Sequence, residues 1–367
     1  MNILIDIGHP AHVHYFRNLY SILRDKHRVI VTCKSVPIIT ELLAHYDIPF
    51  VELGNKGSTI LKKMRYQILF TAKIRSLLIE HKIDLAFGAS ASIIHAAKFT
   101  KTRTILFDDD DQIVQPFTAK FVTPFADLIV SPDALKHEGI SKAIYYPGYH
   151  ELAYLHPKRF SPNPDVLKNY GITVQDKYFI LRFNAFKAHH DINEGGMSSD
   201  QKNQLIGILE QHGKVFVTTE ARLNPQYEKY KLPIAPHEMH DFMYFSQMLV
   251  SDSQTMSSEA SALGVPSFRC NSFAGRLSVL EEEEKKYGLT YSFLPRQFDW
   301  MINTIKDHLT NPNLKLDWGR KRQRMIDDKI DVTAFWAWFI DNYPESKNLV
   351  KTADFNYDQF RGIDSHE

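Results

Sequence analysis

A run of small polar residues, Ser251 to Ser257, is the first feature of the sequence whose chemistry can be interpreted. It follows an apolar segment typical of a buried strand and precedes a short helical pattern that ends at Gly264 and Pro266. The N–H groups that open a helix, together with the helix dipole, suit a phosphate or pyrophosphate group. The residues that we expect to contact such a ligand are Ser253, Gln254, Thr255 and Met256.

Glu259 lies in the first turns of this predicted helix, where its carboxylate could accept two hydrogen bonds from a sugar diol. The same pattern is also typical of an ordinary capped helix, in which a Ser or Thr is the N-cap and Glu259 is its capping-box partner. Both interpretations place Glu259 near the start of the helix, and only the first makes it a binding residue.

His9, His12 and His14 follow Gly8 directly after the first predicted strand, so they lie at the carboxyl end of that strand. Histidine is the usual general base near neutral pH, and an acceptor hydroxyl must lose its proton as it attacks an anomeric carbon. We predict that His12 is the base and that Gly8 and His9 contact the substrate. A metal site and a helix N-terminus with incidental histidines are the alternatives.

Consecutive carboxylates, Asp108 to Asp111, follow another predicted strand that ends at Phe107. Repulsion among them should leave some exposed, paired or with raised pKa values. We expect one of these groups to act as a catalytic acid or base or to orient His12, and we assign this role to Asp108 and Asp109. A bound divalent cation and a solvated acidic turn are the alternatives.

Arg182 ends the first predicted strand of the second half of the chain and opens a polar segment, residues 182–191. Its guanidinium could pair bidentately with a diphosphate as that group leaves. Fixed positive groups contribute most where negative charge develops during a reaction. The other residues of this segment that we predict to bind the substrate are Lys187, His190 and Asp191.

Short apolar strands alternate with helical patterns through both halves of the chain, which predicts two parallel sheets with helices on both faces. We therefore expect an α/β protein with two Rossmann-like, doubly wound domains that face each other across a ligand cleft. The domains are expected at residues 1–160 and 165–330, followed by an aromatic helix at 331–343 and a polar, disordered tail at 344–367. The sequence lacks both a Gly-x-Gly-x-x-Gly pattern after the first strand and a P-loop.

The run from Asp252 to Pro266 resembles the nucleotide-binding motif of GT-B glycosyltransferases and of the non-hydrolysing UDP-N-acetylglucosamine 2-epimerases, although Gln254 stands where those families usually have glycine. The loop around His12 is similar to the Gly-Gly-His loop of the GT-B transferase that makes the lipid II disaccharide. Over residues 1–340 the chain looks like the DUF354 family, which is grouped with GT-B proteins. The residues that match these patterns are Asp252, Ser253, Thr255, Glu259, Ala260, Leu263, Gly264 and Pro266 in the first, and Arg182, Ala188, His190 and Asp191 in the last.

The resemblance implies a GT-B-like fold, a nucleotide-diphospho-sugar donor such as a UDP-sugar, and a last helix that crosses back onto the first domain. It also implies chemistry without a protein-bound metal or other cofactor. The function that we predict is a glycosyltransferase of cell-surface polysaccharide or glycan-precursor biosynthesis, whose partners are the donor and a glycan or lipid-linked acceptor. The alternatives are 2-epimerisation of a UDP-N-acetylhexosamine and binding of a nucleotide-sugar without turnover.

The 367-residue chain has a formal net charge of +1, which argues against nucleic acid as a partner. Its cysteines, Cys33 and Cys270, are too few and too far apart to form a disulfide framework. The first residues lack the basic flank and long apolar core of a signal peptide, and no apolar run is long enough to span a bilayer. We expect a cytoplasmic protein that is able to associate peripherally with the inner face of the membrane.

Overall fold

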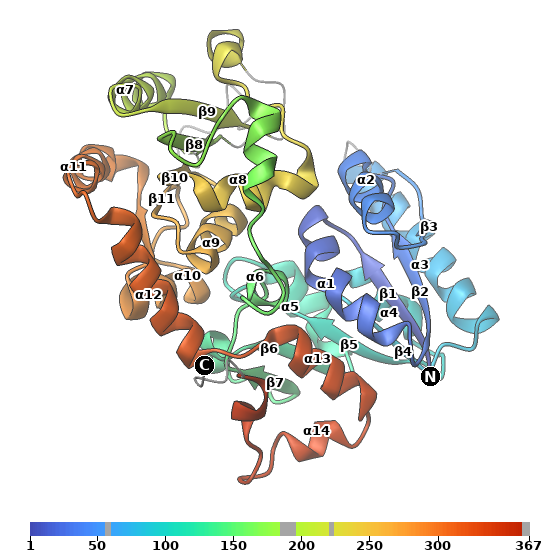
Figure 1. The fold of residues 1–367 in the computed structure, drawn as a ribbon. Coiled ribbons are helices and arrows are strands. Elements are labelled where there is room, and N and C mark those ends of the chain that lie inside the picture. The colour runs from blue at the N-terminus through green and yellow to red at the C-terminus, as the bar shows by residue number, and fades with distance from the viewer. Residues whose placement is uncertain (56–59, 184–195, 220–223, 362–367) are drawn as a thin grey trace. The chain divides into compact units, whose positions relative to one another are not determined.

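The chain folds into two compact units, which the ribbon in Figure 1 shows. The computed structural model describes residues 1–55, 60–183, 196–219 and 224–361. The first unit comprises Met1–Arg159 and Lys329–Glu367, and the second comprises Phe160–Asp328. The C-terminal part of the chain therefore returns to the first unit.

Among the described residues, the first unit contains seven strands: β1 (Asn2–Ile7), β2 (Arg28–Cys33), β3 (Val51–Glu52), β4 (Leu85–Gly88), β5 (Arg103–Phe107), β6 (Leu128–Pro132) and β7 (Ala143–Tyr146). They form one sheet in the order β3-β2-β1-β4-β5-β6-β7, and all neighbouring strands are parallel. Ile3 of β1 aligns with Val29 of β2 and with Leu85 of β4. Because the strands are parallel, their carboxyl ends and the loops that follow them share one edge of the sheet.

The helices of the first unit are α1 (Pro10–Leu23), α2 (Pro37–His45), α3 (Ile60–Glu80), α4 (Ala91–Ala97), α5 (Pro116–Phe121), α6 (Leu152–Leu155), α13 (Val332–Asp341) and α14 (Ser346–Leu349), with short 3₁₀ turns η1 (Thr123–Phe125), η2 (Asp133–Glu138) and η8 (Tyr357–Phe360). Helix α1 begins at Pro10, whose missing N–H costs nothing at the first helical position, and His9 is its N-cap. The loop between β1 and α1 is therefore short and fixed at both ends.

Aromatic side chains join α1 and α13 to one face of the first sheet. Phe16 of α1 lies 5.6 Å from Phe87 of β4 and 5.3 Å from Phe107 of β5, measured between ring centroids. Trp336 of α13 lies 4.6 Å from Phe107, and all four side chains are fully buried. The alternate residues of the same strands, Ala86 and Leu106, pack in a second cluster with α3 and α4. Helices on both faces are what a parallel sheet requires.

Among the described residues, the second unit contains five strands: β8 (Tyr178–Arg182), β9 (Lys214–Thr218), β10 (Met248–Ser251), β11 (Ser267–Cys270) and β12 (Thr290–Phe293). They form a parallel sheet in the order β12-β11-β10-β8-β9. Its longer helical elements are α7 (Ser199–Leu209), α8 (Met239–Phe245), α9 (Gln254–Leu263), α10 (Ser278–Glu282), the π-helical turn η6 (Glu283–Tyr287), α11 (Phe298–Leu309) and α12 (Leu314–Asp328). Short 3₁₀ turns are η3 (Pro164–Tyr170), η4 (Pro225–Tyr230), η5 (Pro236–Glu238) and η7 (Pro295–Gln297).

These two sheets confirm the predicted α/β class with two doubly wound, Rossmann-like domains. Helix α13 belongs to the first unit, where Thr333 donates a hydrogen bond to the Ala153 carbonyl over 2.6 Å. Among the described residues, no helix is both long and apolar enough to cross a membrane.

The tail after Pro344 differs from the disorder expected of it, since its described part packs against α13. Phe360 is buried and lies 5.5 Å from Phe335, while Phe355 lies 5.0 Å from Trp338. The hydroxyl of Tyr357 donates to the Tyr145 carbonyl over 2.9 Å. The aromatic residues of this segment explain the difference, because an otherwise polar tail can dock through a few large apolar side chains.

Candidate functional site

The loop between β1 and α1 holds His9 and His12 through its own backbone. The N–H of Gly8 donates to His12 Nδ1 over 3.2 Å, and the N–H of Ala11 donates to His9 Nδ1 over 3.3 Å. Because Nδ1 of His12 accepts, the neutral ring carries its proton on Nε2. His14, on the other hand, is buried and stacks on Tyr154 at 5.3 Å, so it belongs to the core of this unit.

Lys34 brings a positive charge to the same loop. A Cβ added to Gly8 would lie 3.3 Å from Lys34 Nζ and 3.8 Å from His12 Cε1, which is a tight fit. Burial, together with smaller contributions from the charges of His9 and Lys34, lowers the pKa of His12 to about 3, although the charge of Asp109 opposes this shift. His12 is therefore neutral at physiological pH, and its Nε2–H is a hydrogen-bond donor there.

Asp109 is the centre of a polar cluster formed by the loops after β5 and β7 and by helix α1. The Tyr15 hydroxyl donates to Asp109 Oδ2 over 3.2 Å, and His150 Nδ1 lies 3.1 Å from the same oxygen. Burial acts to raise the pKa of Asp109, but the adjacent His150, His12 and Tyr15 outweigh it and hold that pKa below its ordinary value. Asp109 is therefore an ionised carboxylate at neutral pH.

Asp108 and Asp110 have the opposite character. Burial and the neighbouring charge of Asp109 raise the pKa of each to about 7. Asp108 Oδ1 accepts a hydrogen bond from the Asp110 N–H over 3.4 Å, and Asp110 Oδ2 accepts one from Gln115 Nε2. A carboxyl group that titrates near neutral pH suits general acid–base catalysis, because both of its protonation states are populated.

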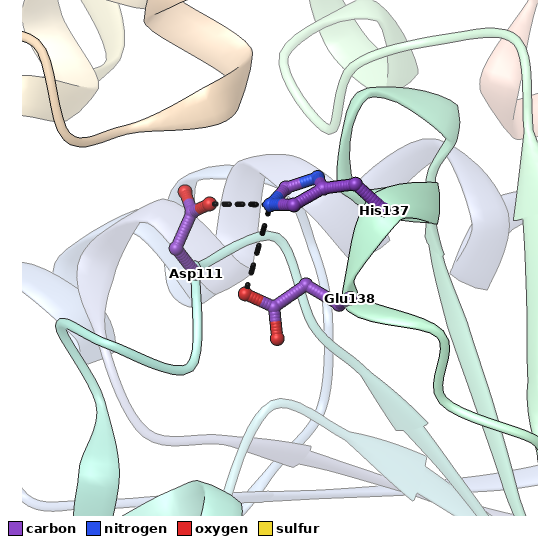
Figure 2. Close-up of side chains that lie close together, drawn as sticks. All are labelled: Asp111, His137 and Glu138. Carbon is purple, nitrogen blue, oxygen red and sulfur yellow. Dashed lines mark ion pairs between the residues drawn. The ribbon is translucent and has the colours of Figure 1, made fainter.

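Asp111, the last residue of the acidic run, points toward a different group of side chains, which Figure 2 shows. His137 Nε2 lies 3.7 Å from Asp111 Oδ1 and 4.0 Å from Glu138 Oε1, and Gln112 N–H donates to Glu138 Oε1 over 3.2 Å. Asp111 follows β5, and the other two close η2 after β6. Among the described residues, Asp111, His137 and Glu138 are the group whose ligand atoms lie close enough together to hold a metal ion.

In the second unit, Ser253 is the N-cap of α9, and its hydroxyl accepts a hydrogen bond from the Met256 N–H over 3.4 Å. The Ser253 N–H in turn donates to Ser251 Oγ over 2.7 Å. Gln254, Thr255 and Met256 form the first turn, so their N–H groups lie at the positive end of the helix dipole. The predicted phosphate loop is thus a capped helix N-terminus at the carboxyl end of β10.

Two cationic residues of this unit belong to β8, the strand next to β10, and to α7, the helix that follows β8 in the chain. Arg182 ends β8, pairs in register with Ser251 of β10, and donates from Nη1 to Thr218 Oγ1 over 3.3 Å. Nζ of Lys202, in α7, lies 4.8 Å from the centroid of the Phe183 ring. Burial lowers the pKa of Lys202, and the negative charge of Asp252 opposes this shift. The predicted residues Lys187, His190 and Asp191 lie outside the described residues.

Glu259 has a protein partner at the position where a sugar diol was expected. Its Oε1 lies 2.9 Å from Nε2 of His240 in α8, and both side chains are buried. Glu259 is also not a capping-box residue, because the third residue after the Ser253 cap is Met256. The structure therefore places Glu259 in a helix–helix contact between α9 and α8.

Several residues of these sites were not predicted from the sequence, namely Tyr15, Lys34, His150, Lys202 and His240. A signal was present for two of them. Tyr15 lies three residues after His12 in the same helix, and His150 follows β7 just as Asp108 follows β5. The contacts of His240 and Lys202 depend on helix packing, for which the sequence contains no local pattern.

The fold has relatives among solved structures. A structure of MnaA from S. aureus with UDP has a TM-score of 0.67 and 14% identity, and the match covers 97% of this chain and 100% of that one. UDP-GlcNAc 2-epimerase from Neisseria meningitidis, bound to UDP-GlcNAc, has a TM-score of 0.60 and 12% identity, and the match covers 92% of this chain and 100% of that one. The glycosyltransferase SsfS6 from Streptomyces sp. SF2575 has a TM-score of 0.57 and 11% identity, and the match covers 93% of this chain and 100% of that one.

These identities show the fold alone, and the fold is of the GT-B type, as predicted. No curated protein matches the sequence significantly. The family described as "Protein of unknown function (DUF354)" matches residues 1–330, so the chain belongs to this family.

Proposed function

We propose that this protein is a glycosyltransferase that binds a UDP-sugar and moves the sugar to a glycan or lipid-linked acceptor. One observation carries the proposal: in the second unit, Arg182 ends β8, and the capped N-terminus of α9 follows the adjacent parallel strand β10. A cation beside a helix N-terminus suits a pyrophosphate. The structural relatives with UDP or UDP-GlcNAc bound support this ligand class.

The reaction breaks the bond between the anomeric carbon and the phosphate oxygen, and it forms a bond from the acceptor oxygen to that carbon. The electron pair leaves with UDP, whose negative charge Arg182 offsets. The proton of the acceptor hydroxyl passes to a base. Asp108, with a pKa of about 7, fits this role better than His12, with a pKa of about 3. In this proposal His12 donates a hydrogen bond from Nε2, and Asp109 positions His150 and Tyr15.

A second candidate is 2-epimerisation of a UDP-N-acetylhexosamine, which needs no acceptor. The supporting observation is the number of acid–base groups in the first unit: Asp108 and Asp110 both titrate near pH 7 beside the Asp109–His150 pair. Removing and returning a proton at carbon uses more such groups than a single transfer does. Epimerases among the structural relatives are consistent with this candidate.

The deciding experiment follows UDP and the sugar together. The protein is incubated with UDP-GlcNAc and other UDP-sugars, with and without a lipid-linked or glycan acceptor fraction, and free UDP and sugar epimers are measured by chromatography and NMR. UDP released only with acceptor supports transfer, and a new epimer without acceptor supports the second candidate. An intact donor after long incubation would overturn both candidates and leave binding without turnover.

Substitutions connect the result to the proposed residues. Arg182→Ala should weaken UDP binding, measured by calorimetry, and Asp108→Asn should leave binding intact while it abolishes turnover. Arg296→Ala is the matched control, because Arg296 is an exposed arginine of the same unit. If UDP neither binds nor stabilises the wild-type protein, the pyrophosphate assignment is wrong.

A further inference from the structure

Large apolar side chains are exposed along one stretch of the first unit, from the end of α4 to η1. Large exposed apolar residues that lie together on a protein surface usually mark an interaction site. Together these residues are called the aromatic strip. The exposed fractions are 83% for Phe99, 67% for Ile113, 65% for Phe117, 45% for Phe121 and 48% for Phe125.

Direct contacts link the four phenylalanines of the strip through Lys98 and His95. Lys98 Nζ lies 4.6 Å from the Phe125 ring and 5.3 Å from the Phe99 ring. Phe117 and Phe121, one helical turn apart on α5, have ring centroids 5.1 Å apart. His95 joins α4 to this segment, because its ring lies 6.0 Å from Phe125 and its Nε2 lies 2.8 Å from the Phe121 carbonyl oxygen.

Phe99 combines a strained backbone with an exposed ring. Its φ of 66° lies in the left-handed region, which is common just after a helix but is usually occupied there by Gly or Asn. A bulky residue in this conformation costs free energy, and a ring that is 83% exposed regains little of it by packing within the chain. A partner molecule that covers the ring would explain why the strained, exposed conformation is present.

The charges of the strip all have one sign. Residues 91–107 and 112–126 include Lys98, Lys101, Arg103 and Lys120, and they contain no Asp or Glu. The intervening carboxylates of residues 108–111 are not exposed, and Asp127 lies 3.5 Å from Arg103. A partner that complements the strip therefore presents both apolar groups and negative charges.

We propose that the aromatic strip docks this protein onto an anionic lipid membrane surface. Aromatic rings favour the boundary between acyl chains and headgroups, and lysine stems extend so that their ammonium groups reach lipid phosphates. Basic residues near such a surface add attraction that decays within a Debye length. Ile113 of the strip lies two residues after Asp111 in the sequence, on the same loop as the acidic run. The proposal does not depend on the proposed function, although it suits a lipid-linked acceptor.

Vesicle flotation tests the proposal with the full chain. Vesicles of phosphatidylcholine with phosphatidylglycerol are compared with vesicles of phosphatidylcholine alone, at low and at high salt. One variant carries Phe117→Ser and Phe121→Ser, and a second carries Lys98→Glu and Lys120→Glu. The matched control carries Trp300→Ser and Lys306→Glu, since these residues form an exposed aromatic and an exposed lysine on α11 of the second unit.

Wild-type protein should float with the anionic vesicles and be released by high salt. Each removed lysine should lower the partition coefficient about fivefold, and charge reversal should lower it further. The phenylalanine variant should lose at least about tenfold, and the control should bind like wild type. Absence of wild-type flotation, or equal flotation of all variants, would overturn the proposal. Light scattering that shows a dimer abolished by the phenylalanine substitutions would also overturn it, in favour of an interface between copies.

Discussion

Neighbouring carboxyl groups in the acidic run have different pKa values because each meets different partners. Asp109 contacts His150 and Tyr15, so its ionised form is stabilised. Asp108 and Asp110 are half-buried beside that negative charge, so their neutral forms are favoured up to about pH 7. A pair of titratable groups whose pKa values are driven apart is the usual arrangement of an acid and a base in one site.

Substitution of Asp108 should stabilise the protein at alkaline pH. The carboxyl group has a pKa of about 7 in the folded protein and 3.8 as the reference value for the unfolded chain. The folded state therefore binds the proton more tightly, and the stability that this contributes is lost as the pH rises from about 4 to 7. Asp108→Asn avoids this loss, so we expect a gain of about 1–4 kcal/mol at about pH 8 and a smaller gain at about pH 5.

Urea denaturation at the two pH values measures this difference. Asp299→Asn, an exposed carboxyl on α11, is the matched control and should change stability by less than about 0.5 kcal/mol. A gain of equal size at both pH values would show that Asp108→Asn acts through packing and not through ionisation.

His12 should remain neutral throughout the physiological range. Its pKa is lowered to about 3 from 6.5, mainly by burial, while the unfolded chain takes up this proton below about pH 6.5. The folded state is therefore destabilised as the pH falls through that value. Long-range ¹H–¹⁵N NMR should show the Nε2–H tautomer with no titration between about pH 5 and 8. The spectrum of His12→Gln identifies the signal, and a midpoint near pH 6.5 would contradict the lowered pKa of the ring.

The sequence was sufficient to group some site residues but not others. Asp109 and His12 could be grouped in advance because each follows a strand of a parallel sheet, whose carboxyl ends share one edge. The partner of Glu259 could not be foreseen, because His240 meets it only through the packing of α8 on α9. His150 could not be assigned in this way, because it follows β7 only after the turn at Pro147 and Gly148.

At the scale of elements, the binding role proposed for the start of α9 can be separated from its structural role as a capped helix end. Ser253→Ala removes the cap and should cost about 1 kcal/mol of stability. Ser253→Asp retains a capping oxygen and so should retain stability, but its negative charge should weaken UDP binding about tenfold if phosphates meet this helix end.

Chemical denaturation and calorimetry with UDP measure the two effects. Ser198 provides the control, because it caps α7 of the same unit in a capping box with Gln201. Ser198→Ala should cost similar stability and leave UDP affinity unchanged. Unaltered UDP affinity in Ser253→Asp would show that the α9 N-terminus is a structural cap only.

At the scale of the whole chain, alternation of strands and helices was enough to predict two doubly wound domains, because each apolar strand followed by an amphipathic helix has few other ways to bury both faces. The completion of the first unit by the end of the chain is a tertiary effect. Lys329 Nζ lies 3.0 Å from Asp133, and Asp331 lies 2.7 Å from Arg159. The tail was the part least accessible to sequence analysis, because the packing of a few aromatic residues decides its structure.

Truncation after Tyr343 should therefore destabilise the first unit. It removes Phe355, Tyr357 and Phe360, which cover Phe335 and Trp338 of α13. Burial of one such ring contributes about 1.5–3 kcal/mol, so we expect a loss of about 3–6 kcal/mol, and Phe360→Ala alone should lose about 2–4 kcal/mol.

Fluorescence of Trp336 and Trp338, read with Trp300 and Trp318 substituted by Phe, follows the unfolding of this unit during urea denaturation. Leu349→Ala, at a tail residue that is 46% exposed, is the control and should change stability by less than about 0.5 kcal/mol. A truncated chain with an unchanged midpoint would mean that α13 holds the first unit together without the tail.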